Sequence, residues 1–113
     1  MAFIHEKLRA YRFALAFYRV VKMLRAGLPR GLGPIGDQMS RAAQSVVLNL
    51  GEGGAQRARD MKRKHYRIAL ASTGECAAAL DLLEIEDAAT PELIALARRR
   101  LSVTAAITSG LAR

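Results

Sequence analysis

Apolar residues recur every three or four positions over most of the chain, which is the spacing of one buried face on an α-helix. Turn residues divide this pattern into four segments: Ile4 to about Gly27, Asp37 to Gly54, about Asp60 to Ile85, and Pro91 to about Leu111. No Val-, Ile- or Thr-rich alternation bounded by turn pairs competes for a β-strand. The pattern therefore predicts an all-α protein: an up-down-up-down antiparallel four-helix bundle that occupies residues 1–113 as a single domain.

The segment from Asp37 to Gly54 shows the helical pattern most clearly. It carries a row of apolar residues at steps of four, three and four: Met39, Ala43, Val46 and Leu50. We expect Asp37 to lie in the first turn, where a carboxylate is favourable, and to pair with Arg41. We expect the helix to end at three glycines, because glycine readily takes the left-handed cap conformation: Gly51, Gly53 and Gly54.

The other segments differ in the width of the apolar face and in side-chain size. The first has two adjacent apolar rows, from Leu8 to Tyr18 and from Ala14 to Leu28, which are wide enough to contact two neighbouring helices. In the third, apolar and small residues follow one face from Met61 to Leu83, and Gly74 among them indicates a packing requirement. The fourth begins with a helix cap, Thr90 followed by a proline.

A loop is predicted between the first two helices, because residues Pro29–Gly36 contain two prolines and three glycines. The glycines have the spacing G-x-G-x-x-G of a dinucleotide-binding loop. However, no strand precedes them and Pro34 interrupts them, so we expect a plain connection here.

Composition agrees with a small helical domain. At 113 residues and 51% hydrophobic side chains the chain can bury a core, and with 5% aromatic residues and no tryptophan that core must be aliphatic. Cys76 is the single cysteine, which excludes an internal disulfide and fits a reducing compartment. No secretory signal is evident, and no apolar run reaches the roughly 18 residues of a membrane span. We therefore expect a soluble, cytoplasmic protein with no membrane partner.

The net charge of +8, from 18 Lys and Arg against 10 Asp and Glu, favours a polyanionic partner, although solubility alone also explains such a charge. Residues 57–67 contain six bases and one acid, whereas residues 75–92 contain six acids and no base. This order opposes the dipole of the third helix, so helix stability does not explain it. A partner or an intersubunit contact would.

In an up-down bundle these bases meet those at the start of the first helix, and Arg113, at one end of the molecule. The other end is expected to be closer to neutral. We interpret the basic end as an interface for RNA or DNA that contacts mainly the phosphate backbone, with Tyr66 stacking on a base. The candidate residues are Lys7, Arg9, Arg12, Arg57, Arg59, Lys62, Arg63, Lys64, Tyr66 and Arg67. The alternative is a solvated basic face with Tyr66 in the core.

A catalytic centre is hard to assemble from this sequence. It has two histidines, His5 and His65, one cysteine and no carboxylate pair placed for acid-base work, so we expect no enzyme, no cofactor and no metal site. We interpret Cys76 as a small core residue. Asn49 and Glu52 lie one turn apart and either satisfy backbone groups at the predicted glycine stop or form a buried interhelical hydrogen-bond site.

The second helix carries the motif Q-x-x-R-A-x-x-S-V-x-x-N-L-x-E-G. Its polar and glycine positions, together with two that follow in the third helix, are Gln38, Arg41, Ser45, Asn49, Glu52, Gly53, Ser72 and Glu75. This pattern resembles the signature of the 23S rRNA-intervening sequence proteins, although Ala71 stands where that family usually has glycine. The resemblance implies a four-helix bundle in which these residues are structural, assembled as a homopentameric ring. It also implies a relation to the accessory variability determinant proteins of diversity-generating retroelements, which bind nucleic acid and a reverse transcriptase.

The charge pattern and the resemblance together predict a non-enzymatic, homo-oligomeric nucleic-acid-binding module. The alternative is a protein-interaction scaffold, or an accessory subunit that holds a reverse transcriptase. In that case the apolar face of the first helix and the acidic turn at residues 84–87 would matter more than the basic end.

Overall fold

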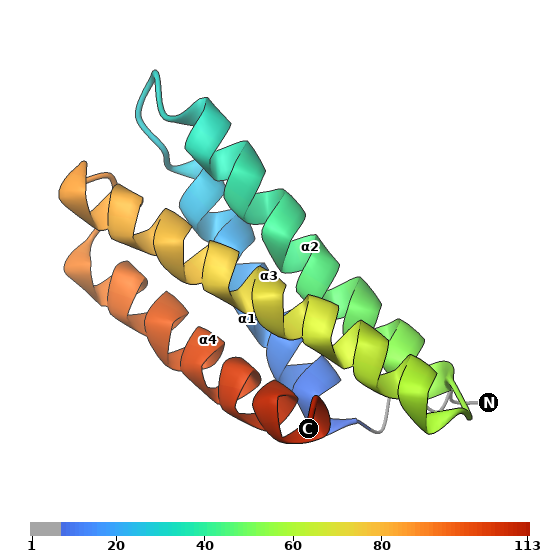
Figure 1. The fold of residues 1–113 in the computed structure, drawn as a ribbon. Helices are drawn as coiled ribbons and strands as arrows, with labels where there is room; N and C mark the ends of the chain where they lie inside the picture. Colours follow the sequence, from blue (N-terminus) through green and yellow to red (C-terminus); the bar gives the residue numbers. More distant parts are fainter. Residues whose placement is uncertain (1–7) are drawn as a thin grey trace.

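The computed structural model describes residues 8–113, and within this range the chain forms four α-helices and no strand. The helices are α1 (Arg9–Ala26), α2 (Gly33–Ala55), α3 (Arg59–Ile85) and α4 (Pro91–Leu111). Figure 1 shows them side by side along the long axis of the molecule. The all-α, four-helix prediction is therefore confirmed. The predicted first helix also includes residues 4–7, which lie outside the described residues.

Each helix packs against two neighbours around a shared core. Helix α2 contacts α1 and α3, and α4 contacts the same two helices. The connections span only residues 27–32, 56–58 and 86–90, and the chain doubles back at each of them (Figure 1). Consequently the end of α2, the start of α3 and the end of α4 lie at one end of the molecule, together with the first turn of α1.

The core consists mainly of aliphatic side chains and alanines, and it also contains Phe17, Met39, Tyr66 and Cys76. The four residues of the apolar row predicted for α2 are all fully buried. In α1 the row from Ala14 to Leu24 is buried, whereas the row from Leu8 to Tyr18 is only half-buried and borders the core. Periodicity therefore identified which face of α1 and of α2 turns inward. None of the described helices combines the length and the apolar character needed to cross a membrane.

Helix α2 begins earlier than its sequence predicts. It starts at Gly33 and places Pro34 in its first turn, where a proline costs no backbone hydrogen bond. The predicted loop therefore ends at Leu32, and Asp37 lies beyond the first turn. Its carboxylate forms an ion pair with Arg25 of α1 and not with Arg41 as predicted.

Helix α2 also ends later than predicted, because the three glycines do not stop it. Gly51, Gly53 and Gly54 are all helical, and the helix continues to Ala55. Gly53 lies against the ring of Tyr66 in α3, so close that a Cβ at this position would be 2.5 Å from Cε1 of the ring. The glycine thus allows two helices to approach and is not a cap.

The ends of α3 and α4 follow local sequence signals. Thr90 caps α4 as predicted, and its Oγ1 accepts a hydrogen bond from the Leu93 N–H at 3.2 Å. Beyond the end of α3, Asp87 takes a φ of 52°, and the Ala88 N–H donates to the Leu83 carbonyl at 3.0 Å, which closes the last turn.

Two predictions for α3 are wrong. Met61 is exposed, although it was placed in the apolar row. Gly74 is exposed as well, and no atom lies within 4 Å of the position that its Cβ would occupy, so no packing contact requires a glycine there.

Candidate nucleic-acid interface

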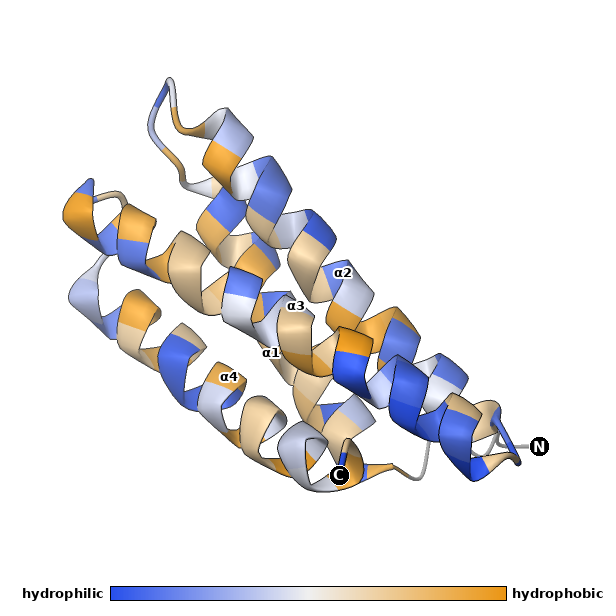
Figure 2. Ribbon diagram, in the orientation of Figure 1, coloured by the Kyte–Doolittle hydropathy of each residue, from blue (hydrophilic) through white to orange (hydrophobic). Residues whose placement is uncertain are grey.

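Six basic residues surround the start of α3: Arg57, Arg59, Lys62, Arg63, Lys64 and Arg67, here called the α3 basic cluster. Figure 2 shows the first turns of α3 as a largely hydrophilic stretch at one end of the bundle. Within residues 8–113, no member of this cluster forms an ion pair with an acidic side chain. The six cations outnumber Asp60, the one acid in this stretch, and none of them is held in an ion pair within the described part of the chain.

Members of the cluster differ in how firmly the bundle holds them. Lys62 Nζ donates to the Gly53 carbonyl of α2 at 3.2 Å, and Arg67 Nε donates to the Ala112 carbonyl beyond α4 at 3.3 Å. Arg63 is half-buried. By contrast, Arg57, Arg59 and Lys64 are exposed, and no hydrogen bond ties their side chains to the described residues. These three side chains are the ones available to an external partner without cost to the fold.

Tyr66 does not belong to the candidate interface, and the prediction that it stacks on a base is wrong. Its side chain is only 5% exposed, because its ring packs against Gly53 on the neighbouring helix. Burial also raises the pKa of its hydroxyl. The alternative interpretation, Tyr66 in the core, is the one that the structure supports.

The basic residues predicted at the start of the first helix are only partly described. Arg9 and Arg12 are exposed on the first turn of α1, at the same end of the molecule as the α3 basic cluster. Lys7 lies outside the described residues. Arg113 is exposed at the same end.

A polar seam joins α2 to α3 beside this end, and several motif residues form it. Ser72 Oγ lies 2.7 Å from Ser45 Oγ, and Asn49 Nδ2 donates to the Ser45 carbonyl at 2.9 Å. Asn49 Oδ1 lies 3.1 Å from His65 Nδ1, within hydrogen-bonding distance. Asn49 therefore takes part in an interhelical hydrogen-bond site, which is half-buried, and also contacts a backbone carbonyl of its own helix; Glu52, predicted as its partner, is exposed. His65 of α3 also belongs to this site, a contact that the spacing of the residues in the sequence does not indicate.

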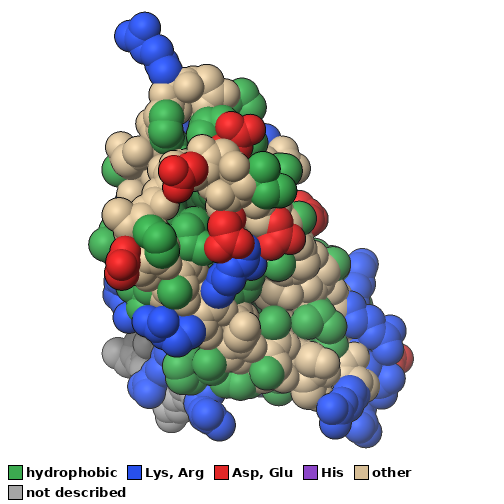
Figure 3. Space-filling view, turned by 90° about the vertical axis from the view of Figure 1, so that its left-hand side faces the viewer, with side chains coloured by type: hydrophobic (Ala, Val, Ile, Leu, Met, Phe, Trp, Pro, Cys, Tyr) green, Lys and Arg blue, Asp and Glu red, His purple; other side chains and the backbone are tan. Residues whose placement is uncertain are grey.

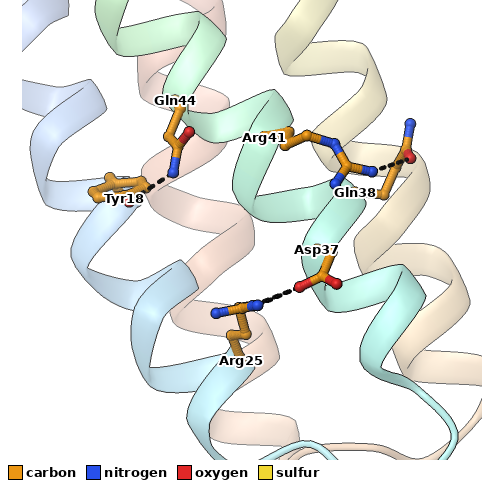
Figure 4. Close-up of polar contacts among 6 residues, drawn as sticks. All are labelled: Tyr18, Arg25, Asp37, Gln38, Arg41 and Gln44. Carbon is orange, nitrogen blue, oxygen red and sulfur yellow. Dashed lines mark hydrogen bonds and ion pairs between the residues drawn. The ribbon is translucent and has the colours of Figure 1, made fainter.

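Other motif residues stay at the surface. Glu52 and Glu75 are exposed, and Glu52 takes no part in the seam. Gln38 and Arg41 are exposed too, and Arg41 Nη2 donates to Gln38 Oε1 at 3.2 Å (Figure 4). Ser45, Asn49, Gly53 and Ser72 thus have structural contacts between helices, whereas the remaining motif residues have none that fix the fold.

The opposite end of the molecule separates its charges instead of mixing them. On the α3–α4 side, acidic side chains gather around the connection at residues 86–90, as Figure 3 shows in red. Arg98 Nη2 lies 2.9 Å from Asp81 Oδ1 and 3.3 Å from Glu84 Oε1. On the α1–α2 side, basic side chains line a groove. Acids and bases occur here in similar numbers, which agrees with the expectation that this end is closer to neutral than the other.

Cys76 is fully buried in α3. Burial, with a contribution from the charge of Glu75, raises the pKa of its thiol to about 12. The thiol is therefore protonated at neutral pH, and the interpretation of Cys76 as a small core residue agrees with its position. Among the described residues, no group of three or more His, Cys, Asp or Glu side chains is placed to hold a metal ion.

Fold and surface together define a small basic four-helix bundle with unpaired cations at one end. The family model of the 23S rRNA-intervening sequence proteins matches residues 6–110, and the chain belongs to this family. A search among curated proteins found no match.

Proposed function

We propose that the protein is a non-enzymatic, homo-oligomeric module that binds RNA or DNA through the α3 basic cluster. The observation that carries this proposal is the group of six cations, none of which is ion-paired within residues 8–113. Unpaired cations attract a phosphate backbone and release its condensed counterions on binding. The family name, which refers to an intervening sequence of ribosomal RNA, is consistent with a nucleic-acid context.

The contacts are with backbone phosphates and not with base edges. The exposed members of the cluster are long flexible cations, and the one aromatic residue among the candidates, Tyr66, is buried. Phosphate contacts set affinity and position but do not read sequence. Binding should therefore depend weakly on nucleotide sequence and strongly on ionic strength.

Self-association into a homopentameric ring of up-down-up-down antiparallel bundles is part of the same proposal. Large apolar side chains remain exposed on α2 and α3: Leu48 at 66%, Leu82 at 49% and Ile85 at 80%. Adjacent exposed apolar side chains commonly mark a protein–protein contact, and Leu82 and Ile85 lie about one turn apart at the end of α3. A ring would bring five copies of the α3 basic cluster onto one particle and strengthen binding through multivalency.

The experiment compares two double variants that remove the same charge. Arg59→Ala/Lys64→Ala removes two exposed members of the cluster, and Arg19→Ala/Arg99→Ala removes two exposed arginines from other surfaces. Fluorescence anisotropy with labelled single-stranded RNA should show at least tenfold weaker binding for the first variant and a small change for the second. Equal affinities for the two variants would contradict the proposal.

A second candidate function is a scaffold, or an accessory subunit for a reverse transcriptase of a diversity-generating retroelement. It is favoured by a surface on which the exposed Leu82 and Ile85 adjoin acidic residues at the end of α3. Such a mixed acidic and apolar surface suits a partner protein with a basic face. Two observations would support this alternative. One is a reverse transcriptase gene beside the gene for this protein. The other is co-purification of the two proteins, which the Ile85→Glu substitution should abolish.

A further inference from the structure

Between α1 and α2, at the end of the molecule opposite the α3 basic cluster, lies an open groove with a volume of about 780 Å³. This volume falls in the range of about 300–1,000 Å³ that is typical of small-molecule sites. Its charged lining consists of Lys22 and Arg25 from α1, Arg30 from the connection, and Asp37 and Arg41 from α2. Four cations therefore face one carboxylate, which leaves a formal charge of +3.

The single carboxylate is already engaged. Arg25 Nε donates to Asp37 Oδ1 at 3.1 Å, and Figure 4 shows the two side chains pointing toward each other from neighbouring helices. Arg41 has only the neutral amide of Gln38 as a partner, at 3.2 Å. Lys22 and Arg30 form no ion pair with any residue in the described range. Lys22 and Arg30 thus line the groove with no counter-charge of their own, whereas Figure 4 shows the guanidinium of Arg41 turned toward Gln38 and away from Arg25.

We propose that this groove binds a di- or triphosphate group. Arginine and lysine side chains are the usual phosphate ligands, and the planar guanidinium of arginine can bond two phosphate oxygens at once. The cations come from three segments of the chain and surround one volume, unlike the α3 basic cluster, which lies on an exposed surface. This arrangement suits a compact and highly charged group better than an extended strand.

Neutral polar groups complete the lining. Gln44 Nε2 donates to the Tyr18 hydroxyl at 3.1 Å across the groove (Figure 4), and Ser40 lies between Asp37 and Gln44 on the same wall. Gly31 of the connection also lines the groove and takes a φ of +92°, a conformation that favours glycine.

Three sources can supply the proposed chemistry: inorganic triphosphate, a nucleoside triphosphate, or the 5′-triphosphate end of an RNA. Isothermal titration calorimetry of the full chain distinguishes these sources. The ligands are sodium triphosphate, ATP, and one short RNA that bears either a 5′-triphosphate or a 5′-hydroxyl. The source is the ligand that binds most tightly and depends most on the groove. Absence of binding by all triphosphate-bearing ligands would overturn the proposal.

Variants locate the site. Lys22→Ala/Arg30→Ala should weaken triphosphate binding at least tenfold without lowering the melting temperature, because both side chains are exposed and unpaired. Arg19→Ala/Arg99→Ala is the control, because it removes the same charge from surfaces outside both the groove and the α3 basic cluster and should leave this affinity unchanged. If both variants weaken triphosphate binding equally, the binding results from general charge attraction, and the proposal that the groove is the binding site is overturned.

Asp37→Asn gives a test with the opposite sign. It removes the only carboxylate of the groove and frees Arg25, so triphosphate binding should become several-fold tighter. Unchanged or weaker binding in a variant that still folds would contradict the proposal. This proposal and the proposed function can fail separately. Binding of RNA that lacks a 5′-triphosphate tests the α3 basic cluster, whereas binding of triphosphate tests the groove.

Discussion

Gly53 and Gly74 are both glycines inside helices, yet their surroundings are opposite. A Cβ on Gly53 would meet three ring atoms of Tyr66 at 2.5–3.0 Å, whereas a Cβ on Gly74 would point into open space. Gly53→Ala should therefore lower the free energy of unfolding by about 2 kcal/mol, because overpacking outweighs the gain in helix propensity. Gly74→Ala should raise it by up to about 1 kcal/mol. Urea unfolding of both variants checks the pair, and shifts of the same sign would contradict this account.

Cys76 makes stability depend on alkaline pH. Its raised pKa, about 12 against an ordinary 9.0, means that above pH 9 the unfolded chain loses the thiol proton while the folded chain keeps it. The contribution of this group is fully present below pH 9 and is lost as the pH rises to 12. The free energy of unfolding should fall in that window by an amount on the order of a few kcal/mol. The free energy of unfolding of the Cys76→Ala variant should fall less steeply with pH. It should still fall, because the raised pKa of Tyr66 acts in the same direction. Parallel pH profiles for the two proteins would count against this explanation.

The hydroxyls of Ser45 and Ser72 allow a test of whether the polar seam couples helices α2 and α3 energetically. They lie 2.7 Å apart, so removing either one leaves the other without this partner. A double-mutant cycle of Ser45→Ala and Ser72→Ala should give a coupling energy of about 0.5–1.5 kcal/mol in unfolding experiments. Ser72 and the exposed Ser102 of α4 form the control cycle, which should be additive. Additivity in both cycles would mean that the seam does not couple the helices.

At the scale of whole helices, the sequence predicts the buried faces better than the helix ends. Periodicity predicted four helices and the buried face of α2, because burial repeats with the local geometry of the helix. It failed at the ends of α2, where Pro34 fits the first turn and Gly53 faces Tyr66. Whether a glycine caps a helix or admits a neighbour depends on a residue from another helix, which local sequence does not specify.

Local sequence does not specify contacts with other helices, and this also explains which features of the two candidate sites the sequence revealed. The α3 basic cluster is contiguous in sequence, so its charge was visible there, whereas the burial of Tyr66 depends on the approach of α2. The groove draws Lys22, Arg30 and Arg41 from three segments, so only the packing of α1 on α2 brings them together. The order of the helices places Arg25, Arg30 and Arg41 at the same end of the molecule, but the sequence does not show that they line one groove.

For the whole molecule, the proposed ring predicts a mass. Five copies of the 12.3 kDa chain amount to about 62 kDa by light scattering. Ile85→Glu, which places a charge where the most exposed large apolar side chain now lies, should reduce the mass toward that of one chain. Met23→Glu, at another exposed apolar position on α1, is the matched control and should leave the mass unchanged. A single-chain mass for the unmodified protein would contradict the ring.

The central claim is that unpaired cations at the start of α3 bind a phosphate backbone. It is tested most directly by titrating single-stranded RNA at a series of salt concentrations and plotting the logarithm of the association constant against that of the salt concentration. Each phosphate contact contributes a slope of about −0.7 for single strands, so the three exposed cations without hydrogen bonds would give about −2, and contacts by all six would give about −4. Arg59→Ala/Lys64→Ala should reduce the steepness by about 1.4, which is two contacts. A slope near zero, or the same slope for this variant and the unmodified protein, would contradict the account.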